Sequence, residues 1–252
     1  MQPDSESARP VSIAMLREMR ITFFNLGPCL VPFDRTIPWS PNGQNNANRT
    51  KAKNMSESLF VTKLYKGRIA PLRDLEKTCL SIAADDTAGQ RWSRQHNYGG
   101  YTSYASLNDL PQRASLFAEL ERAVAKHVAL FARELQFDTA GRKLKLDSLW
   151  INVMQKDAVH TPHIHPHSVI SGTYYVTVPP KSGEIRFEDP RLPMMMAAPP
   201  KKPNARPENR TFMDVEPKPG MLLLWESWLR HGVEPNQARG RRISVSFNYR
   251  LD

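Results

Sequence analysis

The spacing of apolar residues along the chain changes in character near residue 147. Before that point, apolar residues recur every three or four positions, as they do in amphipathic helices. One such segment lies within residues 70–86, and a second runs from about Leu110 to Leu135. Asp109 is a candidate N-cap for the second helix, because Pro111 falls in what would be its first turn. The sequence therefore predicts two helices in this region.

The later part of the chain consists of short runs in which apolar and polar residues alternate, as along half-buried strands. The runs are SLWINVM (148–154), VISGTYYVTV (169–178), GEIRFE (183–188), RTFMDV (210–215), GMLLLW (220–225) and RRISVSFNY (241–249). Prolines lie between the runs and no helical segment separates them, which predicts an antiparallel sandwich or barrel. One further run, Leu59–Lys66, precedes the helices. We expect a mainly β fold with flanking helices, with helical support over about residues 69–136 and a β core over about 147–252.

The first 54 residues differ in composition from the rest of the chain. Residues 40–54 are polar, rich in asparagine and without periodicity, which is typical of disorder. Three acidic residues within the first 18 positions argue against a transit peptide. Met55 follows directly and is a plausible alternative translation start. We expect a disordered extension over residues 1–54 and one domain over residues 55–252.

Composition narrows the functional classes only moderately. The formal net charge is +10, which favours anionic ligands, but the basic residues are scattered and form no run of five or six. Nucleic acid is therefore a disfavoured partner, and a small acidic substrate or cosubstrate fits the charge equally well. Cys29 and Cys79 are the only cysteines, so no disulfide framework is expected. With no apolar stretch long enough to span a bilayer, the prediction is a cytoplasmic protein.

The polar faces of the predicted strands carry an unusual mixture of side chains. Alternation places on one face Arg242, Ser244, Ser246 and Asn248 from the last run, Trp150, Asn152 and Met154 from the first, and Thr173, Tyr175 and Thr177 from the second. Strands on an open surface alternate in the same way. These faces lack lysine and glutamate, however, and such a mixture suits the lining of a wet cavity better than an open surface.

Histidines concentrate in one short segment. Four of the seven lie in HTPHIHPHS, which covers residues 160–168. On a strand, His163 and His165 would point the same way, so both imidazoles could reach one metal ion. His231 follows a different apolar run and could supply a third ligand, which leaves open positions as in facial-triad iron sites. The alternative is a polar loop with incidental histidines.

The order of the motifs resembles that of a known enzyme superfamily. The order is HIHP, SGTYYV, SGEIRFEDPR, PGMLLLWESWLRHGVEPN and RRISVSFN. This order is similar to that of the 2-oxoglutarate/Fe(II)-dependent dioxygenases, and more narrowly to a group of bacterial and phage oxygenases. The resemblance extends from about Phe60 to the C-terminus. It implies a double-stranded β-helix, or jelly roll, that holds Fe(II) and takes 2-oxoglutarate as cosubstrate.

The resemblance also implies roles for residues that bind the cosubstrate. Arg242 matches the arginine that pairs with the far carboxylate of 2-oxoglutarate, and Ser244 matches the small hydroxyl residue two positions later. Tyr175 matches a tyrosine that often shares this contact, and Asn152 is expected near the cosubstrate or the substrate. A buried arginine needs an anionic partner, which supports the first of these roles independently.

The ligand set departs from the usual family pattern at one position. His163 and His231 match two of the iron ligands, but the usual second ligand is aspartate or glutamate, and this chain has His165. Three neutral imidazoles would leave the full double positive charge on the ion. Alternatively, His165 lies outside the ligand set and Asp189 or Asp157 supplies a carboxylate.

The remaining histidines and the long loop carry weaker expectations. His160 and His167 are expected outside the ligand set, with His167 the nearer of the two because it is in phase with His165. Residues 194–210 form a long loop that is either a lid over the site or a simple connection.

The activity implied by the resemblance is hydroxylation of a small molecule or peptide, with release of succinate and CO₂. A cupin-type oxygenase would use three histidines without 2-oxoglutarate, but it normally has a glutamate where this chain has Val169 or Ile170. A metal-free binding module on the same fold and a zinc hydrolase are two further candidate functions. The sequence does not name the substrate or the oligomeric state.

Overall fold

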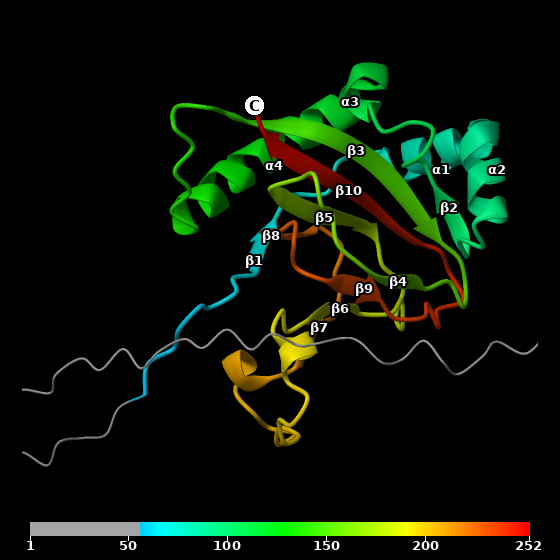
Figure 1. Ribbon diagram of the computed structural model, residues 1–252. Helices are drawn as coiled ribbons and strands as arrows, with labels where there is room; N and C mark the ends of the chain where they lie inside the picture. The colour runs from blue at the N-terminus through cyan, green and yellow to red at the C-terminus, as the bar shows by residue number, and fades with distance from the viewer. Residues whose placement is uncertain (1–55) are drawn as a thin grey trace, which may run out of the picture. The chain divides into compact units, whose positions relative to one another are not determined.

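The computed structural model describes residues 56–252 (Figure 1). The expectation of disorder over residues 1–54 falls outside this range. The strands are β1 (Tyr65–Arg68), β2 (Gly100–Thr102), β3 (Leu144–Met154), β4 (His160–His163), β5 (Ile170–Thr177), β6 (Ile185–Glu188), β7 (Phe212–Val215), β8 (Met221–Glu226), β9 (His231–Val233) and β10 (Arg242–Leu251). The α-helices are α1 (Leu75–Asp85), α2 (Thr87–Gln95), α3 (Leu110–Arg113) and α4 (Ser115–Glu134). None of the helices in this range is long and apolar enough to cross a bilayer.

The strands form two sheets in which all named pairs are antiparallel. The larger sheet has six strands in the order β1-β8-β5-β10-β3-β2, and the smaller has four in the order β4-β9-β6-β7. Figure 1 shows the helices on one side of the larger sheet and the smaller sheet on the other. This arrangement confirms the predicted mainly β fold with flanking helices.

The helices cover an apolar face of the larger sheet. On β10, Ile243, Val245, Phe247 and Tyr249 all point to this side and are at most 3% exposed. They pack with the buried stripe of α4, which consists of Phe117, Leu120, Val124, Val128 and Phe131. The alternate residues of β10 consequently face the smaller sheet, because side chains along a strand point to opposite faces in turn. The polar stripe predicted from the sequence therefore lines the space between the two sheets.

The space between the sheets is only partly filled by apolar side chains. A second, smaller core lies there, formed by Tyr175, Ile185, Phe187, Val215, Leu223, Trp225 and Leu229. Polar residues of β3, β5 and β10 occupy the rest of the larger sheet's inner face. One end of the space between the sheets is therefore lined by polar side chains and is available for a functional site.

The second predicted helix differs from the structure. The helix predicted over Leu110–Leu135 is two helices, because Ala114 is extended (φ −147°, ψ 134°). The break allows both Leu110 and Phe117 to be completely buried. Asp109 occupies the N-cap position of α3 and Pro111 lies in its first turn, as predicted, but the Asp109 carboxylate makes no capping hydrogen bond and instead accepts one from the Arg113 side chain.

The spacing of apolar residues did not predict α2 or β2, and it placed the start of β1 too early. The polar sequence of α2 has no apolar stripe, yet it is helical, and Asp86 caps it by accepting a hydrogen bond from Gly89 N at 2.9 Å. The predicted strand Leu59–Lys66 begins only at Tyr65. The segment around Gly100–Thr102, which reads as a loop, adds an edge strand to the larger sheet.

The packing of α4 against the larger sheet can be tested with two leucines of the same helix. Leu120 is 0% exposed and Leu130 is 43% exposed. Leu120→Ala should lower the free energy of unfolding by about 2–5 kcal/mol, because it leaves a cavity in the core. Leu130→Ala should change it by less than about 0.5 kcal/mol. Urea unfolding followed by circular dichroism measures both, and equal losses would contradict the assigned helix face.

Candidate metal centre

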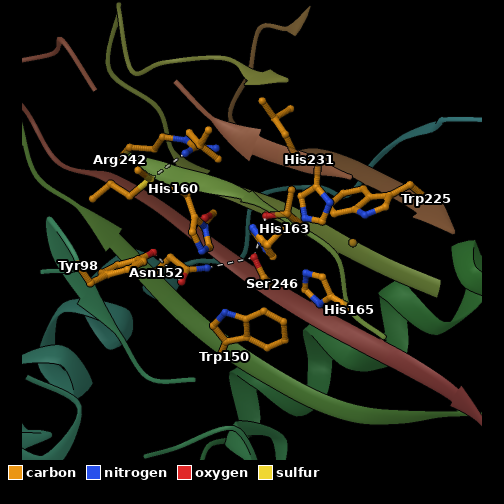
Figure 2. Close-up of a pocket in the computed structure, with 16 residues that line it drawn as sticks. Tyr98, Trp150, Asn152, His160, His163, His165, Trp225, His231, Arg242 and Ser246 are labelled. Atoms are coloured by element: carbon orange, nitrogen blue, oxygen red, sulfur yellow. Dashed lines mark hydrogen bonds between the residues drawn. The ribbon is translucent and has the colours of Figure 1, made fainter. Parts of the chain in front are cut away.

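Three histidines from two neighbouring strands and one loop come together at an open end of the space between the sheets. His163 is the last residue of β4, His231 is the first of β9, and the two are paired in register. His165 lies two residues beyond the end of β4. One ring nitrogen from each lies within 4.8 Å of the others (Figure 2). The structure thus brings together all three imidazoles that the sequence singled out.

The route by which His165 reaches this cluster differs from the prediction. A strand running through both residues was expected to aim His163 and His165 the same way, but β4 ends at His163. The backbone N–H of His165 donates instead to the carbonyl of Ser227 at 2.9 Å. This bond fixes the segment after β4 so that the imidazole returns toward His163, with ring centroids 5.1 Å apart.

Each imidazole is held so that the same nitrogen remains available. The Nδ1 atoms of His163, His165 and His231 each lie 2.8 Å from an accepting oxygen, on Thr161, Asn248 and Leu229 respectively. Because these oxygens only accept, each Nδ1 carries the hydrogen and each Nε2 presents a lone pair. The Nε2 atom of His165 is buried with no hydrogen-bond partner among the described residues. This is the arrangement by which proteins orient histidines toward a metal ion.

Burial keeps the three imidazoles uncharged at neutral pH. It lowers the pKa of His165 to about 4, assisted by the nearby His163, although the bond to Asn248 opposes the shift. Burial also lowers the pKa of His231 well below its usual value and, less strongly, the pKa of His163. Metal ions bind the neutral form of imidazole, so the cluster has the required protonation state.

Asn248 of β10 is a functional candidate that sequence reasoning placed on the cavity face but gave no role. Its Oδ1 lies 2.8 Å from His165 Nδ1 and also accepts from Ser171 Oγ at 2.8 Å. Its Nδ2 donates to Ser148 Oγ at 3.3 Å, and Ser171 is bonded in turn to Ser227. The amide is therefore held from two sides, which fixes the orientation of the His165 ring. The sequence signal that could have identified Asn248 is its position as a short polar residue on the same strand face as Arg242.

The alternative carboxylate ligands do not join the cluster. Asp189 is paired with the Arg191 side chain, and Asp157 is exposed in a turn. Within residues 56–252, no acidic side chain belongs to the group of ligating atoms, and none lines the cavity that extends from the imidazoles to Arg242. The prediction that Asp189 or Asp157 replaces His165 is therefore not supported by the geometry.

His160, and not His167, approaches the cluster. The ring centroid of His160 lies 4.4 Å from that of His163, and the side chain lines the cavity. His167 is exposed and does not line that cavity, so the expected order of the two is wrong. The reason is the same as for His165, because the chain leaves the strand after His163 and the alternation no longer holds.

The guanidinium of Arg242 lies inside the protein and has no anionic partner among residues 56–252. Arg242 is 2% exposed, and no acidic residue of the described range lines the cavity around its guanidinium. Nη1 donates to the sulfur of Met154 at 3.0 Å, a weak acceptor, and Nε has no partner among the described residues. The guanidinium carbon lies 5.1 Å from the ring centre of Tyr175. Arg242 and Tyr175 thus lie together as predicted, and Figure 2 shows Arg242 well apart from His165 and Trp225.

The other predicted cosubstrate residues line the same cavity. Ser244 is 4% exposed and faces it. Asn152 also faces it, but its Oδ1 accepts from Tyr98 and Thr102 and its Nδ2 donates to Ser246. Asn152 is therefore largely occupied by neighbouring side chains and holds Tyr98 against the cavity wall.

The cavity between the imidazoles and Arg242, which we call the inner cavity, has a volume of about 40 Å³. A single buried water molecule needs only about 10–15 Å³ of such volume, so the inner cavity has room for a few water molecules. Trp225 forms one wall, with its ring centroid 4.6 Å from that of His231. None of residues 194–210 lines the inner cavity, and Figure 1 shows this loop projecting away from the sheets, so it acts here as a connection and not as a lid.

The donor set fits a ferrous ion. Three neutral imidazoles with free Nε2 atoms suit a first-row divalent metal, and three protein ligands leave positions for other molecules. The buried, unpartnered Nε2 of His165 and Nε of Arg242 are each explained by a bound group.

Comparison with known proteins agrees with this geometry. Residues 148–248 match the model of a family described as "Putative 2OG-Fe(II) oxygenase". No curated protein matches the chain by sequence. The matched residues include all three histidines of the cluster and Arg242.

Several solved structures are similar to this chain. EctD from S. alaskensis is 13% identical, with 75% of this chain and 73% of that chain covered and a TM-score of 0.50. HygX from Streptomyces hygroscopicus is 16% identical, with 75% and 82% covered and a TM-score of 0.45. A 2OG-Fe(II) oxygenase-family oxidoreductase from Burkholderia pseudomallei is 18% identical, with a TM-score of 0.33. The match covers 44% of this chain and 46% of that chain, so it spans less than half of that relative. At such identities these likenesses concern the fold alone.

The family match supports membership of the 2OG-Fe(II) oxygenase superfamily, whose members are enzymes that use Fe(II) and 2-oxoglutarate. It confirms the resemblance found in the order of the motifs. The jelly-roll fold expected from that resemblance agrees with the two facing antiparallel sheets.

The metal centre predicts different behaviour for two histidines two positions apart. His165→Ala should weaken Fe(II) binding by more than about 100-fold, since it removes a ligand and not merely a group that orients one. His167→Ala is the matched control and should bind iron as the unaltered protein does. Iron content after anaerobic reconstitution and gel filtration measures the effect. Full iron content in the His165 variant would contradict its place in the ligand set.

The position of Asn248 predicts a smaller loss of metal affinity than removal of His165. Asn248→Ala removes the acceptor for His165 Nδ1 and should weaken metal binding by roughly 10–100-fold. Anaerobic titration with Co(II), followed by its visible absorption, gives the affinity. Asn209→Ala, at an exposed loop position, is the control for loss of an asparagine. An Asn248 variant that stays folded and binds Co(II) with unchanged affinity would contradict the positioning role.

Proposed function

We propose that this protein is an Fe(II)- and 2-oxoglutarate-dependent oxygenase that hydroxylates a small organic substrate or a peptide. The observation that carries the proposal is the combination of two features in one cavity. Three imidazoles present free Nε2 atoms at one side, and a buried guanidinium without an anionic partner lies at the other. A metal ion alone would account for the first feature, but only an additional anion accounts for the second.

In this proposal the protein's own residues hold the reactants in place. His163, His165 and His231 would hold the iron, and Arg242 would pair with the far carboxylate of 2-oxoglutarate. When bound, iron and 2-oxoglutarate supply the oxidising chemistry, with succinate and CO₂ as by-products of substrate hydroxylation. Tyr175, packed against the guanidinium, limits the directions in which Arg242 can point. Ser244 faces the same cavity and offers a hydroxyl to the cosubstrate.

The absence of a carboxylate among the described ligating groups has an electrostatic consequence. In the usual family pattern one acidic ligand offsets part of the charge of the iron. With His165 in its place the metal centre keeps a charge of +2, and Arg242 adds a further positive charge inside the same cavity. Both charges attract a dianion, and little water is present to screen the attraction. Binding of 2-oxoglutarate is therefore expected to depend on electrostatics more strongly here than where an acidic ligand is present.

Cosubstrate binding requires a local rearrangement. The inner cavity has a volume of about 40 Å³, far below the range of about 300–1,000 Å³ that is typical of small-molecule sites, so a five-carbon diacid needs additional space. The contact between Arg242 and the Met154 sulfur is weak and is the one that a carboxylate would replace. Methionine adapts readily to a new neighbour, because its side chain has three rotatable bonds. We therefore expect Arg242 and Met154 to move when the cosubstrate binds.

The rival functions are weaker for specific reasons. A cupin-type oxygenase needs no diacid and gives no role to the buried guanidinium. A metal-free binding module gives no role to three imidazoles whose Nδ1 atoms are all fixed by acceptors. A zinc hydrolase needs a general base, and no acidic residue lines the inner cavity. A cytoplasmic location remains part of the proposal.

Arg242 predicts a specific loss of cosubstrate affinity. Arg242→Ala should weaken 2-oxoglutarate binding by about 2–5 kcal/mol while Fe(II) binding persists. Arg241→Ala, at the exposed neighbouring position, should leave both affinities unchanged. Anaerobic calorimetric titration of the iron-loaded protein with 2-oxoglutarate measures the difference. Equal 2-oxoglutarate affinities in the two variants, or no 2-oxoglutarate binding by the unaltered iron-loaded protein, would contradict the proposed function.

A further inference from the structure

A second and larger cavity adjoins the metal centre. This outer cavity has a volume of about 460 Å³, within the range of about 300–1,000 Å³ that is typical of small-molecule sites. His163 and His165 line both cavities, whereas Arg242 lines only the inner one. The outer cavity therefore reaches the metal centre without including the group that would hold the cosubstrate. Neither iron nor 2-oxoglutarate accounts for it.

Aromatic rings from several elements form the walls of the outer cavity. Trp92 comes from α2, Tyr98 and Tyr104 from either side of β2, and Trp150 from β3. Tyr104 and Trp150 meet edge to face, with ring centroids 5.0 Å apart. Trp150 is also stacked near His165, at 6.0 Å, so the aromatic wall continues to the metal centre. Trp150 is 5% exposed and Tyr104 is 48% exposed, which places Tyr104 nearer the mouth.

The outer cavity differs in charge from the chain as a whole. The formal net charge of the protein is +10, yet within residues 56–252 no lysine or arginine lines this cavity. Over the same range its one acidic lining residue is Asp147, and four histidines also line it. Asp147 lies 3.7 Å from the side chain of Arg250, and both side chains are more than a third exposed. Such a surface contact is weak, so the carboxylate remains available to another cation.

We propose that the outer cavity binds the substrate and that the substrate is a small molecule carrying a cationic amine. An ammonium group is attracted to the faces of tryptophan and tyrosine and to a carboxylate, and this cavity offers both. A phosphate or carboxylate would find no lysine or arginine there among the described residues. The role as substrate rests on the proposed oxygenase function, but binding of the cation needs neither iron nor cosubstrate.

Three probes of nearly the same shape isolate the contribution of charge. Choline is a cation, 3,3-dimethylbutan-1-ol replaces its nitrogen with carbon, and 3,3-dimethylbutanoate is an anion. Titrations of the full chain without metal, followed by the indole N–H signals in NMR spectra, give the three affinities. We expect choline to bind with a dissociation constant on the order of 1 mM or below and at least about tenfold more tightly than the alcohol. The anion should not bind in this cavity.

Variants locate the binding site of the cation. Asp147→Asn should weaken choline binding about three- to tenfold and leave the alcohol unaffected, because it removes charge and not shape. Trp92→Leu should weaken the binding of choline more than that of the alcohol, since leucine keeps apolar contact and loses the aromatic face. Glu119→Gln, an exposed position on α4, is the control for loss of a surface acid and should have no effect.

The outcomes separate this inference from the proposed function. Equal affinities for choline and the alcohol, no binding of choline, or tighter binding of the anion would each overturn the amine assignment. If this occurred while the unaltered protein still bound Fe(II) and 2-oxoglutarate, only the substrate class would be wrong. If choline bound as expected and the metal and cosubstrate titrations failed, the cation site would stand and the oxygenase proposal would be wrong.

Discussion

A buried positive charge without an anionic partner is the constraint on which the rest of the site depends. Burying an unpaired guanidinium costs several kcal/mol, and the described residues offer Arg242 only a methionine sulfur and a tyrosine ring. A fold that keeps such a residue inside gains from it only when an anion enters. Three uncharged imidazoles lie in the same cavity, so a metal ion would add to the positive charge already there. A dianionic cosubstrate relieves both charges at once, which explains why the two features occur together.

One strand links this site to the stability of the fold. The residues of β10 alternate between the apolar core under the helices and the cavity between the sheets, so Arg242 and Asn248 are held by the same backbone as Val245 and Phe247. Because β10 pairs with β3 on one side and β5 on the other, its register is fixed along its length. A one-residue slip would turn the whole polar face into the core. The strand that carries Arg242 and the support for His165 therefore lies among the most constrained parts of the larger sheet.

The sequence predicted those parts of the structure that follow from local periodicity. The alternation in β3, β5 and β10 was sufficient to identify the cavity face, and the spacing of histidines together with the resemblance in motif order pointed to His163, His165 and His231. It was not sufficient to place His165, because β4 ends two residues earlier and a hydrogen bond to Ser227 sets the path. The approach of His160 and the role of Asn248 depend on which strands become neighbours, and local spacing does not contain that information. The break at Ala114 likewise serves tertiary packing and has no proline or glycine to mark it.

The two cavities divide the charges of the site between them. Among the residues that the structure describes, the inner cavity is lined by a guanidinium and by no acidic residue, whereas the outer cavity is lined by a carboxylate and by no lysine or arginine. A diacid is therefore favoured on one side of the imidazoles and disfavoured on the other, and a cation shows the reverse preference. Such a division discriminates between two ligands by repulsion as well as by attraction, so that neither occupies the other's place.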